Sequence, residues 1–237
     1  MRKVLWVLAC FCVLGAPAAL AAGNSKPLQV SIFSPVQLVP EEQSIRGVRL
    51  NLIYSDNKDV SGLTLATGWN RTGGDGAGIA LGAVNWNEGN FYGWQMGLIN
   101  YDGNRVVGLQ AGLINVDKGD TTGIQLGLVN WDYGFFHGYQ SGILNYTGGH
   151  FVGLQDGVIN IARNDLSGLQ HGLINYAGGI VNGVQVGYLW NFAQEMHGLQ
   201  LGLINVTNSL DGIQIGLGNY NGNKEPLEFM PIVNWAF

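Results

Sequence analysis

Three side chains that could do chemistry stand at equal intervals: Ser141, Asp156 and His171 are each 15 residues apart. In a hydrolytic triad, histidine takes the proton from serine while aspartate orients the histidine. In a sheet whose strands repeat every 15 residues, these side chains line up in the order Ser, Asp, His. Histidine then stands beside aspartate and not beside serine. We therefore interpret the row as a polar spot on an apolar stripe and not as a catalytic site.

The other candidates for chemistry do not converge. The histidines occupy unrelated places in the repeat and do not gather with cysteines or carboxylates as zinc ligands would: His137, His150, His171 and His197. No Gly-Lys-Ser/Thr nucleotide loop is present. Aspartates recur 15 residues apart, and turn geometry explains them better than weak calcium binding: Asp102, Asp117 and Asp132. We predict no enzyme and no catalytic, cofactor-binding or metal-binding residues.

The elements that carry these residues come from one repeated unit. A glycine recurs with spacings of 14 to 16 residues, almost always 15: at 47, 62, 78, 93, 108, 123, 138, 153, 168, 183, 198 and 212. We number this glycine position 0, so that Gly108 to Val116 reads Gly-Leu-Gln-Ala-Gly-Leu-Ile-Asn-Val from position 0 to 8. A fixed short period indicates one structural unit, copied and stacked.

The unit is typical of β-structure. Glycine or asparagine recurs at position 11, as a two-residue hairpin turn requires, and no helical period is visible. With that turn, position 5 of one strand faces position 1 of the next, and bulky residues meet glycine or an apolar partner. The sequence predicts an all-β antiparallel meander of about 14 strands. So many strands favour closure into a barrel, because an open sheet would leave two exposed edges.

The alternative is a parallel β-solenoid in which each 15-residue copy forms one coil. Glycine is tolerated at coil corners, and an odd period causes no difficulty. Equivalent asparagines would then stack into a side-chain ladder: Asn100, Asn115, Asn130, Asn145, Asn160 and Asn175. The hairpin-type turns and the last strand lead us to expect the barrel, with the solenoid as the alternative.

The ends of the chain indicate export. Arg2 and Lys3, an apolar run and Ala19-Leu20-Ala21 predict a signal peptide over residues 1–22, followed by one repeat domain over 23–237 with regular repeats from 45 to 237. Both cysteines, Cys10 and Cys12, lie in this leader. Its removal takes away Arg2 and Lys3 and leaves 9 basic against 16 acidic residues, a net charge of −7. That balance argues against nucleic acid as a partner.

The last strand resembles the C-terminal strand of bacterial outer-membrane proteins, because Phe229, Pro231, Val233, Trp235 and the terminal Phe237 alternate along it. Tryptophans at or within a residue of position 8 could form an interfacial aromatic belt or cover a sheet edge: Trp69, Trp86, Trp131, Trp190 and Trp235.

The Gly-Leu-Gln-x-Gly-Leu-Ile/Val-Asn units as a whole resemble the uncharacterised surface-repeat proteins of bacteria. The resemblance implies an envelope or surface location and supplies no activity and no site residues. Together with the last strand, it leads us to expect an exported protein of the outer membrane or cell surface. We expect a non-enzymatic structural protein or small-solute pore with outer-membrane lipid as its partner. A secreted or surface β-solenoid that serves binding or adhesion is the alternative. The sequence identifies no protein or glycan partner.

Overall fold

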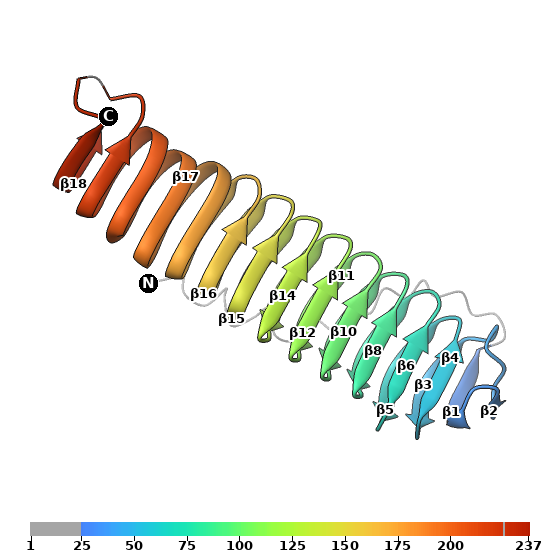
Figure 1. Cartoon of the computed structure of the whole chain (residues 1–237). Helices are drawn as coiled ribbons and strands as arrows, with labels where there is room; N and C mark the ends of the chain where they lie inside the picture. The colour runs from blue at the N-terminus through green and yellow to red at the C-terminus, as the bar shows by residue number, and fades with distance from the viewer. Residues whose placement is uncertain (1–24, 225) are drawn as a thin grey trace, which may run out of the picture.

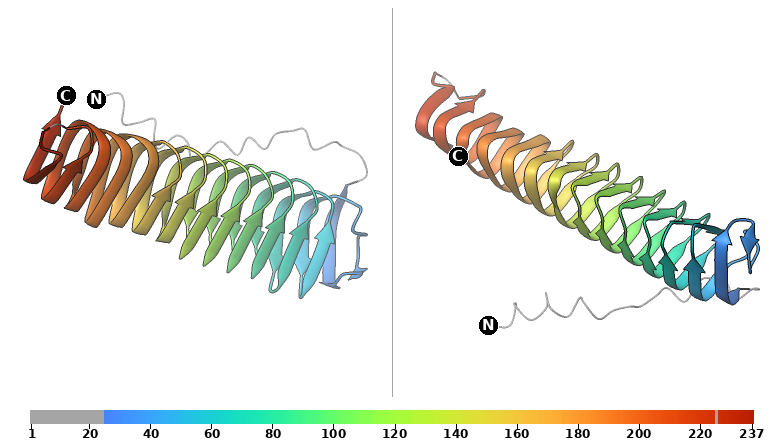
Figure 2. Two further views of the ribbon diagram at one scale, coloured as in Figure 1. Left: turned by 45° about the horizontal axis from the view of Figure 1, so that its top comes forward. Right: turned by 60° about the horizontal axis from the view of Figure 1, so that its bottom comes forward.

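One 15-residue copy forms one coil of two short strands and two corners. In a representative coil, β11 (Val106–Ala111) ends at Gly112 and Leu113, β12 (Ile114–Asp117) follows, and residues 118–120 return the chain to the next coil. The next copy repeats this path beside the first. The protein is therefore a parallel β-solenoid, seen as a long rod in the computed structural model (Figures 1 and 2), which describes residues 25–224 and 226–237. The predicted signal peptide, residues 1–22, lies outside the described residues.

The strands form two parallel sheets that face each other across a narrow interior. The first sheet contains β3 (Ile45–Asn51), β5 (Val60–Ala66), β7 (Gly76–Leu81), β9 (Phe91–Met96), β11 and β13 (Thr121–Leu126). The second contains β4 (Tyr54–Asn57), β6 (Trp69–Thr72), β8 (Val84–Asn87), β10 (Ile99–Asp102), β12 and β14 (Val129–Asp132). The later coils continue both sheets in β15 (Phe136–Thr147), β16 (Phe151–Ala162) and β17 (Leu166–Asn221).

The ends of the rod differ from its middle. At the N-terminal end, β1 (Lys26–Phe33) pairs in parallel with β3 and antiparallel with β2 (Val36–Gln37). At the C-terminal end, β18 (Phe229–Ala236) pairs antiparallel with β17. β1 and β18 therefore lie at opposite ends of the rod (Figure 1).

The predicted antiparallel barrel is wrong, and the solenoid alternative is confirmed. Adjacent copies pair in parallel at equal positions, so that Leu109 faces Ile124 and Asn115 faces Asn130. The turn at positions 10 to 12 joins the two sheets of the coil instead of closing a hairpin. In the described coils the interior is filled by side chains, so the small-solute pore that we expected with the barrel is withdrawn.

Amide ladders fill much of this interior. Gln110 Nε2 donates a hydrogen bond to Gln95 Oε1 at 3.1 Å, and Asn100 Nδ2 donates to Asn115 Oδ1 at 2.8 Å. The glutamine ladder continues from coil to coil to Gln214, and the predicted asparagine ladder continues to Asn219. These amides are fully buried, and a buried polar group is stable only when it is hydrogen-bonded.

Apolar side chains fill most of the remaining inward positions of the later coils. In the later coils, position 13 carries large residues and position 9 carries alanine, which together form the largest apolar cluster: Phe136, Phe151, Leu166, Val181 and Met196 with Ala162, Ala177 and Ala193. Large residues at one position and alanine at the other fill the narrow space between the sheets.

The glycine at position 0 is required by the close approach of neighbouring coils. Gly138 has a φ of 144°, and a Cβ built on it would lie 1.9 Å from the carbonyl oxygen of Gly123. A side chain there would both strain the backbone and push the coils apart.

We predict that Gly138→Ala lowers the free energy of unfolding by about 3 kcal/mol or more, because it combines positive-φ strain with overpacking. The matched control is Gly73→Ala, where the nearest atom to an added Cβ is the Asn57 carbonyl oxygen at 3.9 Å. This control is expected to change stability by less than about 1 kcal/mol. Urea unfolding followed by far-ultraviolet circular dichroism measures both, and equal midpoints would contradict the coil geometry.

We predicted that Asp102, Asp117 and Asp132 are turn residues, and this prediction is wrong. Their side chains point into the interior and are fully buried. Glutamine amides donate to them: Gln110 Nε2 lies 2.7 Å from Asp102 Oδ2 and 2.8 Å from Asp117 Oδ1. Burial raises the pKa of Asp117 to about 6, and burial together with the charge of Asp117 raises the pKa of Asp102 and Asp132 well above the usual value.

A folded-state pKa above the unfolded value means that the folded protein binds the proton more tightly. The stability contributed by these protons is complete below about pH 4 and is lost as the pH rises through 6 and beyond. We predict that the free energy of unfolding of the wild-type chain falls by up to about 1.4 kcal/mol per pH unit for each such proton as the pH rises. Asp117→Asn should flatten this dependence and the exposed Glu42→Gln should not. The measurement is the urea unfolding midpoint of each protein at pH 5, 6.5 and 8. The same pH dependence in the wild-type chain and both variants would contradict the raised pKa values of the buried aspartates.

Candidate functional site

The most unusual surface of the rod is an apolar edge, which we define as the side chains at positions 5 and 6 of each coil. In the representative coil these are Leu113 and Ile114, at the corner between the two sheets, and they are 49% and 39% exposed. Position 5 is apolar and exposed in coil after coil: Leu98, Leu113, Leu128, Ile143, Val158, Leu173, Leu203 and Leu217. Contiguous exposed apolar surface is typical of sites that contact another protein, a membrane or a ligand.

The apolar surface continues from this edge onto both sheets. On the first sheet it includes Ile79, Trp94, Met96 and Leu126. On the second sheet the outward row at position 8 is mostly aromatic. Because inward positions hold amides and outward positions hold leucine and isoleucine, the usual distribution of a soluble protein is partly reversed.

The opposite side of most coils is polar or glycine-rich, although Tyr133 and Phe135 are 49% and 52% exposed there in one coil. We call positions 10 to 12 the polar edge, which the representative coil forms with Lys118, Gly119 and Asp120. Exposed polar residues recur along it in other coils: Glu88, Asn104, Arg105, Arg163 and Asn164. The rod thus has one apolar and one largely polar long edge.

An aromatic row at position 8 lies between these two edges on the second sheet. The Trp86 and Tyr101 rings stack with centroids 3.9 Å apart, and the Trp131 and Tyr146 rings stack at 4.1 Å. Trp86 and Trp131 lie at position 8, whereas Trp69 pairs with Val84 at position 6 of the next coil, Trp190 lies near the corner and Trp235 lies in β18. Stacking covers the ring faces and leaves the ring edges outward, which disfavours the row as a platform for sugar rings.

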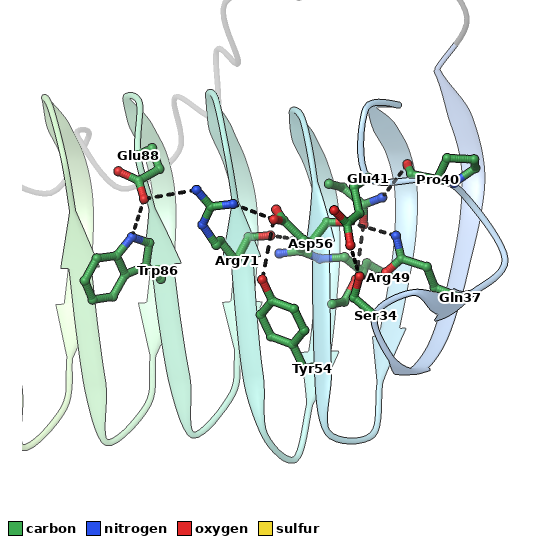
Figure 3. Close-up of polar contacts among 12 residues, drawn as sticks. Ser34, Gln37, Pro40, Glu41, Arg49, Tyr54, Asp56, Arg71, Trp86 and Glu88 are labelled. Carbon is green, nitrogen blue, oxygen red and sulfur yellow. Dashed lines mark hydrogen bonds and ion pairs between the residues drawn. The ribbon is translucent and has the colours of Figure 1, made fainter.

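In the first coils a charged cluster replaces aromatic residues in this row. Arg71 contacts Asp56 at 2.5 Å and Glu88 at 3.5 Å, and Trp86 Nε1 donates to Glu88 at 2.7 Å (Figure 3). Tyr54 Oη also donates to Asp56, at 3.4 Å. Arg71 and Glu88 line a surface groove of about 490 Å³ with Ile53, Tyr54, Trp69 and Trp86. The charges therefore lie at the level between the apolar and polar edges.

Ser141, Asp156 and His171 do form the predicted row. They are register partners on the outward face of the first sheet, with aspartate in the middle. His171 Nδ1 lies 2.6 Å from Asp156 Oδ1, and His171 Nε2 lies 3.0 Å from the Tyr188 hydroxyl. Histidine bridges aspartate and tyrosine, and no hydrogen bond joins Ser141 to it within residues 25–224 and 226–237. This geometry is a surface polar spot and does not form a serine triad.

Two other histidines also lie beside acidic residues of the next coil. His150 lies 3.1 Å from Asp165, and His197 lies 3.5 Å from Asp211. These pairs are at least two-fifths exposed, and exposed ion pairs contribute little stability. In the described part of the chain, no group of three or more histidine, cysteine, aspartate or glutamate side chains could hold a metal ion.

The described residues contain no helix long and apolar enough to cross a membrane. No protein-family model matches the chain, and no match was found among curated proteins or solved structures. Any proposal about function therefore rests on the surface of the rod.

Proposed function

We propose that the protein is a non-enzymatic, exported β-solenoid of the bacterial cell surface, which binds the outer-membrane lipid along its apolar edge. The observation that carries this proposal is the apolar surface that wraps around a convex corner while amide ladders fill the interior. In this role the rod is a binding module whose polar edge stays in water.

The dimensions of one coil support insertion into a single lipid leaflet. Five residues of extended chain separate position 5 from position 10, a distance of roughly 16 Å. Half of a bilayer's hydrocarbon core is about 15 Å thick. Leu113 would then lie deepest, and Lys118 would lie among the headgroups.

The row at position 8 supports the same placement. Tyrosine and tryptophan prefer the boundary between hydrocarbon and headgroups, because each has an apolar ring and a polar tip. Trp86, Tyr101, Trp131 and Tyr146 occupy that level, and so does the charged cluster around Arg71.

Backbone hydrogen bonds present no obstacle to insertion. Neighbouring coils pair through their backbones along the apolar edge, where for example Leu113 N donates to Leu98 O at 2.9 Å and Ile114 N to Leu98 O at 3.0 Å. A structure with satisfied backbone groups avoids the main cost of entering lipid. Each half-exposed leucine or isoleucine gains about 1 kcal/mol on leaving water.

Lipid fits this surface better than a second copy of the chain. A flat interface between two rods covers one sheet face, whereas the apolar surface here turns a corner and continues on both faces. A fluid apolar phase can cover a convex edge along its whole length. The Asp156–His171 pair interrupts the surface, and its position predicts shallower insertion in those coils, since an aspartate at the bilayer centre costs about 3 kcal/mol.

The test is flotation of the protein with phosphatidylcholine vesicles. We predict that the wild-type chain floats and that Leu113→Asp with Leu128→Asp weakens partitioning at least about tenfold, because two charges enter the apolar edge. The matched control places the same two charges away from this edge, as Asn104→Asp with Gln194→Asp, and should bind like wild type. Circular dichroism must show that both variants fold.

Two outcomes would contradict the proposal. One is a wild-type chain that stays in solution with vesicles present. The other is equal loss of binding in the two double variants, since this would indicate a general charge effect and not insertion of the apolar edge.

A further inference from the structure

A buried cation interrupts the glutamine row near its N-terminal end, where Arg49 pairs with Gln29 of β1 on one side and with Thr64 on the other. Arg49 lies at position 2, where later coils carry glutamine, and its side chain is directed into the interior with the residue 2% exposed. Arg49 Nη1 donates to the Arg71 carbonyl oxygen at 2.8 Å, and its other nitrogens donate to the hydroxyls of Thr64 and Thr72 at 3.3 and 3.2 Å. All of these acceptors are uncharged.

The charge of Arg49 is only partly balanced. Of the described residues, none forms an ion pair with it. The nearby Asp56 is the direct partner of Arg71, which also contacts Glu88, and Asp56 is the one carboxylate whose charge acts appreciably on Arg49 (Figure 3). Burial lowers the pKa of Arg49 to about 9, against the smaller opposing effect of Asp56. A buried charge without a close partner is strongly unfavourable.

A small cavity lies beside this guanidinium group. It exists because Gly76 and Ala80 stand where the next coil carries Phe91 and Gln95. Its volume is about 20 Å³, and its lining includes Arg49, Thr64, Thr72, Asn87 and Gln95. A cavity of this size holds one occupant of about the size of a water molecule.

Hydrogen-bond donors line part of the space, and apolar side chains such as Val60 and Phe91 line the rest. Guanidinium has five N–H groups, and the contacts of Arg49 use three nitrogen atoms, each through one hydrogen bond. The Thr64 and Thr72 hydroxyls and the Gln95 amide line the same space. One acceptor, the Asn87 Oδ1 atom, is buried without a partner.

We propose that this cavity is a binding site for one monatomic halide anion, with chloride as the natural ligand. A halide would lie against the buried Arg49 guanidinium group, which has no ion-pair partner among the described residues, and would accept hydrogen bonds from the neighbouring donors. Sulfate and phosphate are too large for the space. The site is independent of lipid binding, because it lies inside the rod.

The first test compares stability in two salts at equal ionic strength. The wild-type chain and Arg49→Gln, which restores the ladder residue of later coils, are refolded from urea in sodium bromide or in sodium gluconate. We expect the folding equilibrium constant of wild type to be about tenfold larger in bromide, as for a ligand at about ten times its dissociation constant. Arg49→Gln should show no difference between the salts.

The second test needs no variant. Crystals of the wild-type chain grown in bromide should show an anomalous difference peak beside Arg49. A water molecule between the guanidinium group and Asn87 Oδ1, without anomalous signal, would overturn the proposal. The same salt response in wild type and Arg49→Gln would overturn it as well.

Discussion

The structure depends on hydrogen bonds between identical amide side chains in successive coils. Each inward glutamine or asparagine of the ladders forms a hydrogen bond with the same residue one coil away, and this repeated pairing keeps the spacing near 15 residues. The glycine at position 0 lets the coils approach closely enough for these bonds. Once amides occupy the inward positions, most of the leucine and isoleucine of each copy has to face outward.

This arrangement explains why the apolar edge is so regular. Each coil repeats the same corner, so Leu98, Leu113 and Leu128 stand in line along the axis. Departures occur inside the rod. The aspartates at position 9 and Arg49 at position 2 place ionisable groups where other coils carry alanine, threonine or glutamine. Proton binding neutralises the buried aspartates, and the proposed anion would neutralise Arg49.

The sequence predicted the repeat, the all-β class and the asparagine row, but it favoured the wrong topology. Glycine-rich turns suit a hairpin and a coil corner equally well. The antiparallel pairing of Leu at position 5 with Leu at position 1 was as acceptable as the parallel pairing of each residue with its own copy. The decisive signal was the identity of Asn115 with Asn130, since buried amides gain most from pairing like with like.

The functional surface was harder to predict. The row of Ser141, Asp156 and His171 was placed correctly, because any sheet with this period aligns them. Asp117 was assigned to a turn, because the hairpin model ended the strand before it. Arg49 was missed, although it stands in the glutamine position of its copy. The apolar edge was missed as well. The outward apolar side chains of the two sheets meet along one edge because the chain turns at Gly112 and Leu113, and the antiparallel model had no corner there.

The most direct test is a nitroxide scan of residues 109–120 in a chain of residues 23–237, which contain no cysteine. The account predicts immobile labels at 110, 115 and 117. Even-numbered residues point inward before the corner at Gly112 and Leu113, and odd-numbered residues point inward after it. With vesicles present, labels at 113 and 114 should be accessible to oxygen and labels at 118 and 119 to a water-soluble relaxation agent. Unbroken alternation from 110 through 112, 114 and 116 would contradict the coil, and water-accessible labels at 113 and 114 would contradict insertion of the apolar edge.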